Sequence, residues 1–201
     1  MNRLLAVCAL VCAALLAGCA TTRVVDSQVL AIANVPPGMN LQGATYRFER
    51  LPSQAANPEA GLAEQQAEQA LAAVGLVRND AAARLSVQVG FLGTQYLSDP
   101  WGRPYGWSPY GSIMLGHGAP WGSGVGVGMS MRMPPSPQYH REVSLLLRDL
   151  SSGQVVYETR ASHDGPWSDS TRIFATLFQA ALANFPAPPA GMQRVNIEIP
   201  R

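Results

Sequence analysis

The sequence predicts an α+β fold: a mainly antiparallel sheet with two helices packed on one face, plus a long loop rich in Gly, Pro and aromatic residues. Several stretches alternate apolar and polar residues like half-buried strands, and two others repeat apolar residues with the helical period. Turn residues join two of the alternating stretches directly, as in a hairpin. The resulting order of strand, helix, strand, loop, two strands, helix and strand is typical of the α+β class.

The first predicted strand and helix lie in residues 44–75. The stretch Ala44–Leu51 alternates and stops at Pro52, as expected of a strand. A helix is predicted to begin at Asn57-Pro58-Glu59, because Asn caps helices, Pro is tolerated at the first helical position and an acid suits the first turn. Its apolar face is small and consists of Ala63, Ala67, Ala70, Leu71 and Val74, followed by Gly75 as the C-cap.

Three further strands are predicted in the middle of the chain. The stretch Arg84–Phe91 alternates strictly, and we expect the strand to continue to Tyr96. Arg141–Asp149 and Gln154–Ser162 also alternate, and the turn residues Asp-Leu-Ser-Ser-Gly that end at Gly153 connect them. The Asp149 side chain is therefore expected to bond to backbone amides of this turn.

A second helix is predicted after the hairpin, with Ser168-Asp169 as its cap and Pro186 as its end. Its apolar stripe consists of Phe174, Leu177, Phe178, Ala181, Leu182 and Phe185. These side chains are larger than the alanines of the first helix, so we expect this helix to contribute more of the core. A last strand is predicted at Val195–Ile199.

The first 18 residues have the pattern of a secretory signal. After Arg3, the run from Leu4 to Leu16 contains only Leu, Ala, Val and Cys, and at about 13 residues it is shorter than the roughly 20 that span a bilayer. The run ends in Leu16-Ala17-Gly18-Cys19, which resembles the lipobox of bacterial lipoproteins. The alternative is a secreted protein in which Cys19 has no special role.

The lipobox resemblance implies cleavage between Gly18 and Cys19 and a diacylglyceryl group on the Cys19 thiol. Ala20 follows the cysteine, and by the same resemblance a residue other than Asp at this position favours the outer membrane. We therefore expect a lipid-anchored protein of the outer membrane that faces the periplasm.

Composition excludes several classes of function. The chain has 14 basic residues, all Arg, and 13 acidic ones, so nothing indicates an electrostatic nucleic-acid binder. Cys8 and Cys12 lie in the signal and Cys19 is the lipidation site, so the mature chain is expected to have no free thiol. A disulfide framework, a cysteine nucleophile and a metal site with cysteine ligands are thereby excluded.

We divide the chain into a signal at 1–18, a lipidated tether at 19–43 with a first strand at Arg23–Ala33, and an α+β domain at 44–201. This domain contains an insertion at 98–137 with nine Gly, seven Pro and five aromatic residues. A loop of this length is usually either functional or disordered. We expect it to be an interaction surface, formed by Trp101, Tyr105, Trp107, Tyr110 and Trp121. The alternative is a disordered or locally packed insertion.

Four features together resemble the domain-of-unknown-function family 4136, a family of Gram-negative envelope lipoproteins. They are Cys19, Tyr46-Arg47-Phe48, the Gly- and Trp-rich segment 101–128, and the unit that runs from Leu145 through Gly153 to Tyr157. The family usually has Trp where this chain has Tyr157. The resemblance implies an envelope location and a fold, but no catalytic residue.

No catalytic or metal-binding motif is found. His117, His140 and His163 are interpreted as surface imidazoles, because no two of them have the close spacing of metal ligands. Glu64 and Glu68 are read as a solvated helix face. Ser123 has Gly on both sides and lacks the strand–turn–helix context of a nucleophile elbow. No cofactor is expected.

The leading hypothesis is an outer-membrane-anchored domain without catalytic activity that binds or scaffolds a component of the cell envelope. Its expected partners are the membrane, through the lipid, and an envelope protein or glycan. One alternative is an envelope enzyme of hydrolase type with a site assembled from His and Asp residues. Another is an accessory factor in outer-membrane lipid or protein assembly.

Overall fold

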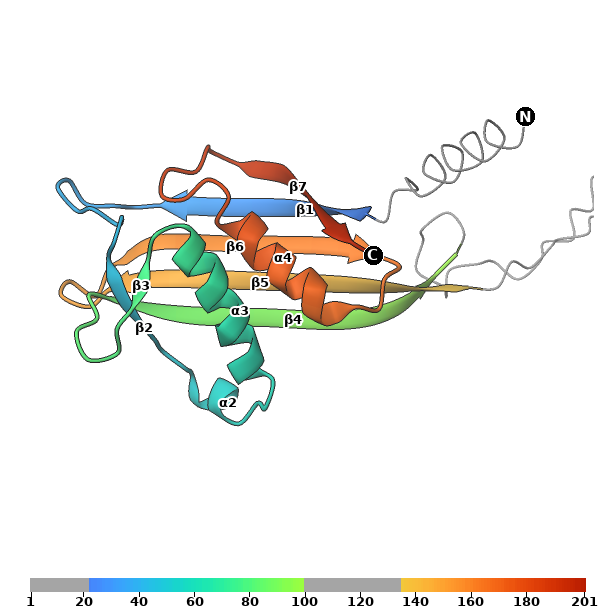
Figure 1. The fold of residues 1–201 in the computed structure, drawn as a ribbon, viewed down its shortest axis with the longest axis horizontal. Coiled ribbons are helices and arrows are strands. Elements are labelled where there is room, and N and C mark those ends of the chain that lie inside the picture. Colours follow the sequence, from blue (N-terminus) through green and yellow to red (C-terminus); the bar gives the residue numbers. More distant parts are fainter. Residues whose placement is uncertain (1–21, 100–134) are drawn as a thin grey trace, which may run out of the picture.

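A computed structural model describes residues 22–99 and 135–201. Within these ranges seven strands form a mixed sheet in the order β3-β2-β4-β5-β6-β1-β7 (Figure 1). The strands are β1 Thr22–Ala33, β2 Thr45–Phe48, β3 Val77–Arg78, β4 Leu85–Ser98, β5 Ser136–Asp149, β6 Val155–Gly165 and β7 Met192–Pro200.

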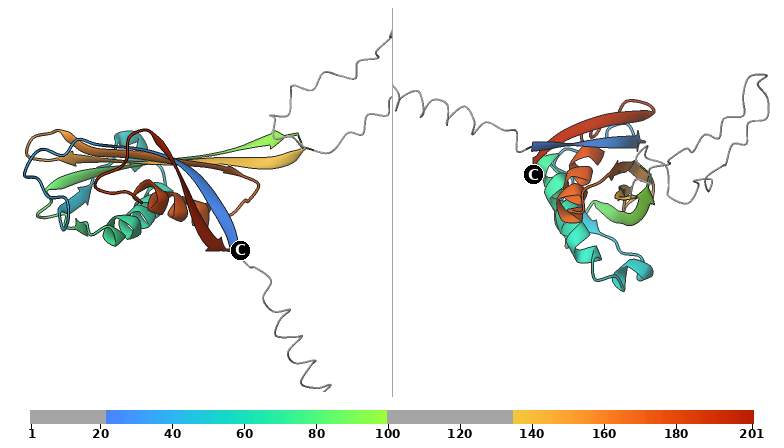
Figure 2. Two further views of the ribbon diagram at one scale, coloured as in Figure 1. Left: turned by 90° about the horizontal axis from the view of Figure 1, so that it is seen from above. Right: turned by 90° about the vertical axis from the view of Figure 1, so that its right-hand side faces the viewer.

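The described ranges also contain three helices, which are α2 Pro52–Ala55, α3 Ala60–Ala73 and α4 Ser170–Ala181. Both long helices lie against the same face of the sheet (Figures 1 and 2). Helix α4 contacts β1, β5, β6 and β7, whereas α3 contacts β3, β4 and α4. No helix in these two ranges is long and apolar enough to cross a membrane.

The α+β class and the largely antiparallel sheet are confirmed, with two corrections. The sheet is mixed, because β2 pairs in parallel with both β3 and β4 while the other neighbours are antiparallel. Helix α3 causes this arrangement, since it returns the chain to the same end of the sheet after β2. The described residues also form three helices rather than two, because the chain turns into the short helix α2 at Pro52, which stands at its first position.

The strand expected at Arg23–Ala33 is present as β1. It lies between β6 and β7, with Gln28 opposite Ser162 on one side and opposite Arg194 on the other. The sheet therefore begins at Thr22, ahead of the domain boundary predicted at Ala44.

Helix α4 presents large apolar side chains to the sheet. Ile173, Leu177 and Phe178 are fully buried, and the predicted stripe is shifted, because Phe174 is only half-buried. The helix ends at Ala181, before the predicted end at Pro186. Helix α3 instead buries Ala60, Ala63, Gln66, Ala67, Ala70 and Leu71. Its short side chains allow the helix to lie close to the sheet.

The turn between β5 and β6 has the structure expected of its residues. Asp149 Oδ2 accepts hydrogen bonds from the backbone N–H of Ser152 at 3.0 Å and from the hydroxyls of Ser151 and Ser152. Gly153 adopts a φ of 72°, which a side chain would disfavour. The Ser151 and Ser152 hydroxyl bonds, in that order, hold the pKa of the Asp149 carboxyl below its ordinary value.

We expect Asp149→Asn to lower stability at neutral pH more than at acid pH. Because the folded-state pKa is depressed, the ionised carboxylate stabilises the fold above its unfolded pKa of about 3.9, and this contribution is lost as pH falls through the folded pKa. Urea unfolding at about pH 7 and pH 3 should show the gap between wild type and variant shrinking in acid. Glu198→Gln on the exposed side of β7 is the control. A gap that is equal at both pH values would contradict the prediction.

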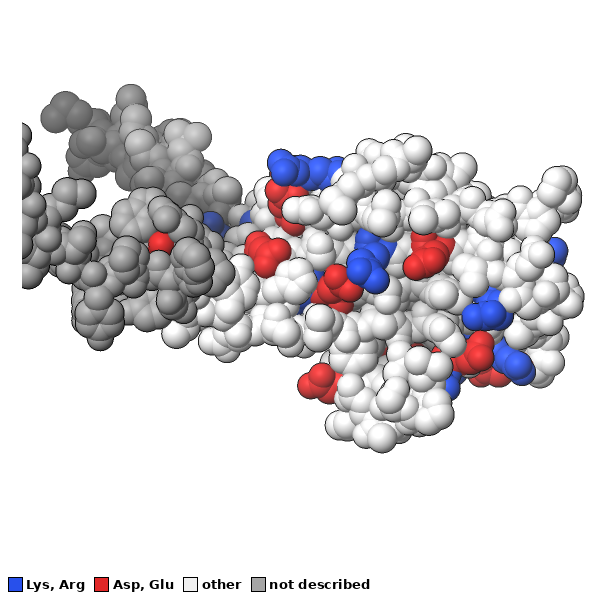
Figure 3. Space-filling view, turned by 180° about the vertical axis from the view of Figure 1, so that it is seen from behind, with Lys and Arg blue, Asp and Glu red and all other residues white. Residues whose placement is uncertain are grey.

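The sheet face opposite the helices is uncovered in the described structure and carries charges of both signs (Figure 3). Arg160 pairs with Glu142 across β6 and β5 at 3.4 Å, and Arg194 pairs with Asp26 across β7 and β1 at 3.5 Å. Exposed pairs of this kind contribute little to stability. The same face also exposes the apolar side chains of Val24, Leu30 and Ile32 on β1.

Candidate binding site at the start of helix α4

A trough runs between the outer half of β4, the start of α4 and the start of α3. Its larger part is a cavity of about 430 Å³ lined by Glu59, Phe91, Leu92, Gly93, Thr94, Gln95, Tyr139, His140, Arg141, Ser170 and Phe174. A smaller cavity of about 100 Å³ is lined by Glu59, Leu62, Ala63, Gln66, Phe91, Ser170, Thr171 and Phe174. The two cavities share Glu59, Phe91, Ser170 and Phe174 and together form one site, the trough.

The apolar floor of the trough is built from β4 and α4. The rings of Phe91 and Phe174 meet edge to face with centroids 6.2 Å apart. Gly93 lies beside them, and a Cβ atom at this position would stand 3.4 Å from Cζ of Phe174. The missing side chain at Gly93 thus keeps this part of the floor open.

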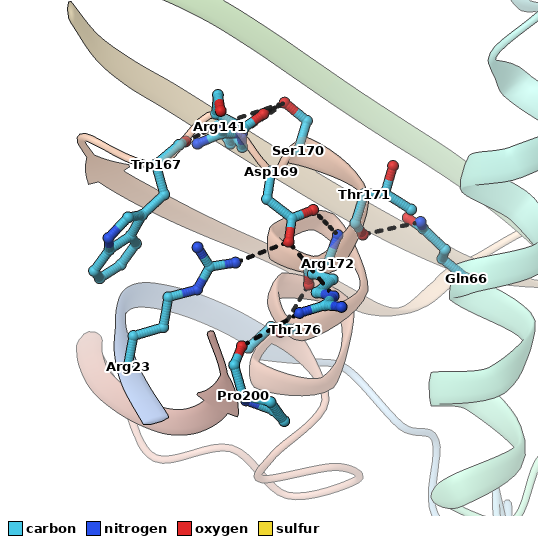
Figure 4. Close-up of polar contacts among 11 residues, drawn as sticks. Arg23, Gln66, Arg141, Trp167, Asp169, Ser170, Thr171, Arg172, Thr176 and Pro200 are labelled. Carbon is cyan, nitrogen blue, oxygen red and sulfur yellow. Dashed lines mark hydrogen bonds and ion pairs between the residues drawn. The ribbon is translucent and has the colours of Figure 1, made fainter. Parts of the chain in front are cut away.

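Arg141 supplies a buried positive charge to the trough wall. Arg141 is only 1% exposed to solvent. Nε and Nη2 both donate to Oγ of Ser170 at 3.1 Å, and Nη2 also donates to the carbonyl of Trp167 at 2.7 Å (Figure 4). The Tyr139 ring lies 4.9 Å from the guanidinium carbon. Nη1 is buried and has no hydrogen-bond partner in the part of the chain that the structure describes.

Burial lowers the pKa of the Arg141 guanidinium from its ordinary value. Tyr139 and Asp169 each raise this pKa without offsetting the effect of burial, and the Asp169 carboxylate also binds other residues. This carboxylate pairs with Arg23 at 3.0 Å and with Arg172 at 3.5 Å, and it caps α4 by accepting from the Arg172 N–H (Figure 4). Three arginines around one aspartate leave this region positively charged.

Trp167 connects this arginine cluster to the sheet. Its ring stacks on His163 with centroids 5.7 Å apart, and Arg23 lies 5.0 Å from the indole centroid. His163 Nδ1 donates to the Asp26 carbonyl at 2.7 Å. The interpretation of His163 as a surface imidazole is therefore wrong, because the residue is 5% exposed and packed under Trp167.

His140, which lines the larger cavity, pairs with Asp164. His140 Nδ1 is 3.0 Å from Oδ1 of Asp164, and the Tyr96 hydroxyl donates to the same oxygen at 3.3 Å. Both side chains of the His–Asp pair are partly exposed, at 31% and 53%. The fold thus brings together one histidine and one aspartate, the residue types that the hydrolase alternative requires.

The other predicted positions are distributed as follows. Glu64 binds Arg50 and Glu68 binds Arg78, so both acids of α3 are ion-paired. The interpretation as a solvated face fits Glu68 but not Glu64, whose side chain is only 12% exposed. In the described ranges no group of three His, Cys, Asp or Glu residues could hold a metal ion. The remaining predictions lie outside the described residues; they concern Gly18, Cys19, Trp101, Tyr105, Trp107, Tyr110, His117, Trp121 and Ser123.

Sequence reasoning missed the residues that form the trough. One signal was available: Arg141 has the same strand parity as Val143 and Leu145, so it must point toward the helices with them. No local pattern marks Arg23 or Trp167. They reach α4 only because β1 and the end of β6 lie side by side in the sheet.

The structures that match this chain in a comparison with known structures include the following two. A PDZ domain protein from Parabacteroides distasonis ATCC 8503 matches with a TM-score of 0.50 at 12% identity, over 88% of this chain and 39% of that one. The chain thus spans about two-fifths of that protein. A PelC dodecamer subunit from Paraburkholderia phytofirmans has a TM-score of 0.45 at 14% identity, over 80% of this chain and 99% of that one. At 12–14% sequence identity, the similarity between these proteins and this chain is a similarity of fold and not of function.

At the level of sequence, no curated protein is significantly similar to the chain. The profile described as "Domain of unknown function (DUF4136)" matches residues 38–187. The matched region extends from the residues before β2 to those after α4, and therefore includes the trough and the β5–β6 hairpin. The chain belongs to the DUF4136 family.

Proposed function

We propose that this protein is a lipoprotein of the outer membrane whose domain binds or scaffolds an envelope component without catalysing a reaction. The observation that carries the proposal is the distance between lipobox and fold. Strand β1 begins at Thr22, the third residue after Cys19. An extended chain spans at most about 3.3–3.6 Å per residue. A lipid on Cys19 would hold the Thr22 end of the sheet within about 10 Å of the bilayer.

The same end of the sheet bears the segment proposed to be the interaction surface. Ser98 at the end of β4 pairs with Ser136 at the start of β5, and both lie at the end where β1 begins (Figure 1). Residues 98 and 136 therefore lie at the same end of the sheet as the proposed anchor, although Figure 2 shows that the β4–β5 end and the start of β1 point in different directions. This placement supports a partner close to the membrane surface, such as an envelope protein or glycan.

The contacts of the acidic residues support a binding role rather than general acid–base chemistry. Asp149 holds a turn, and Glu64 and Glu68 pair with arginines on the surface. Asp169 caps α4 and binds two arginines. In each case a structural contact accounts for the carboxylate.

A second candidate function is an envelope hydrolase, which is favoured by the 3.0 Å contact between His140 and Asp164. A carboxylate that orients an imidazole is a recurrent part of hydrolytic sites. If the protein is a hydrolase, the full chain should hydrolyse p-nitrophenyl esters. His140→Ala should then abolish this activity. Equal rates of ester hydrolysis for the wild-type protein and His140→Ala would rule out this hydrolase.

The third candidate is an accessory role in outer-membrane lipid or protein assembly. If it is correct, assembly factors should be found among the crosslinked partners.

We expect Cys19→Ser to move the protein from the membrane fraction to the soluble fraction or to trap the uncleaved precursor. Each buried CH₂ of an acyl chain contributes about 0.8 kcal/mol to membrane binding, so several chains together anchor a protein stably whereas one chain binds only marginally. Membrane fractionation and the mass of the mature chain measure the effect. Cys12→Ser, within the signal, is the matched control and should behave like wild type. A Cys19→Ser protein that still matures and fractionates with outer membranes would rule out lipidation.

A further inference from the structure

The trough combines one buried cation with an apolar surface. Arg141, Ser170, Tyr139 and His140 line the larger cavity together with Phe91 and Phe174. The apolar surface continues into the smaller cavity, where the exposed Leu62 joins Phe91 and Phe174. A cavity of about 430 Å³ lies within the usual range of small-molecule sites, roughly 300–1,000 Å³.

Arg141 is an unusual residue to find in such a wall. Among the described residues no carboxylate forms an ion pair with the buried guanidinium, and Nη1 has no hydrogen-bond partner there. A buried donor that lacks a partner costs free energy, and more so when it is charged. The residues around Arg141 do not remove this cost, because Asp169 is held by Arg23, Arg172 and the first turn of α4.

From this arrangement we propose that the trough is a binding site for a small amphipathic anion, with its carboxylate or phosphate group facing Arg141 and its apolar body lying on Phe91 and Phe174. A guanidinium binds both anionic groups through charge-assisted hydrogen bonds. Glu59 lines both parts of the trough, so its carboxylate disfavours any anionic group that Arg141 does not bind. The ligand therefore has its charge at one end only. The site is formed by described residues and does not require the lipid anchor.

The test compares four soluble probes of one shape on the unmodified full chain: benzoate, phenyl phosphate, benzyl alcohol and benzylamine. Saturation-transfer NMR titrations give their affinities. We expect at least one of the two anions to bind about tenfold or more tightly than benzyl alcohol, and benzylamine not to bind. The preferred anion then distinguishes a carboxylate from a phosphate ligand. Equal affinities for benzoate, phenyl phosphate and benzyl alcohol, or no anion binding at about 10 mM, would overturn the proposal.

Three variants locate the site. Arg141→Met should weaken anion binding about tenfold or more, whereas Arg160→Met, which removes an arginine from the uncovered face, should leave it unchanged. Gly93→Val keeps every charge and fills the floor beside Phe174, so it should abolish binding. If circular dichroism shows that Arg141→Met does not fold, the affinities of the four probes and the effect of Gly93→Val still test whether the trough binds the anion. Unchanged anion binding in Gly93→Val would show that the trough is not the site.

Discussion

Replacing Phe178 by Ala in α4 is expected to lower the free energy of unfolding by about 3–5 kcal/mol. Phe178 is fully buried in the core between α4 and the sheet. The substitution removes the ring from an apolar environment and leaves a cavity that the neighbours fill only in part. Urea unfolding of the full chain, followed by circular dichroism, measures the loss.

Ala67→Ser in α3 is the matched comparison, because Ala67 is also fully buried. Serine adds one hydroxyl, which on a helix can donate to the carbonyl four residues earlier, so the expected loss is much smaller. The comparison tests whether α4 contributes more of the core than α3. Similar unfolding midpoints for the two variants would contradict this.

Replacing Asp99–Met133 by a short Gly-Ser link is expected to leave a folded domain that no longer recovers its partners. The β4–β5 pairing ends at Ser98 and Ser136, so a short connection can close this hairpin without disturbing the ladder. The segment also carries five aromatic residues, which provide large contact areas at low cost in conformational entropy. Cooperative unfolding tests the fold, and a pull-down from crosslinked cells tests the binding.

A second variant keeps the length of the segment and replaces only its aromatic residues by Ser; these are Trp101, Tyr105, Trp107, Tyr110 and Trp121. It should lose the same partners as the deletion. A deletion protein that fails to fold would place the segment in the core. A deletion protein that folds and recovers the same partners would show that binding occurs elsewhere.

The parts of the fold that could be predicted are those whose pattern is local. The alternation in β4, β5 and β6 and the stripe of α4 each follow from neighbouring residues, as does the Asp149 turn. The parallel pairing of β2 could not be predicted, because β3 has only two residues, Val77 and Arg78, and shows no period. Its position depends on where α3 returns the chain, which is a tertiary property.

The candidate site was less predictable than the fold for the same reason. Arg141 could have been recognised as an inward arginine from the parity of its strand. Its partners Ser170 and Trp167 come from a later part of the chain, and Arg23 joins the cluster from β1. A single sequence contains no signal that connects these positions.

The position of β1 between β6 and β7 also determines the order in which the sheet can be completed during synthesis. The first strand to be made has no neighbour in the sheet until its two partners, the last two strands, have been made. Until then a 12-residue strand has two unpaired edges, and such edges are sites of aggregation. Pairing between the two ends of the chain is also slow, because a long loop must close first. Loss of the C-terminal residues would therefore leave β1 paired on one side only, with β6, and would expose its other edge.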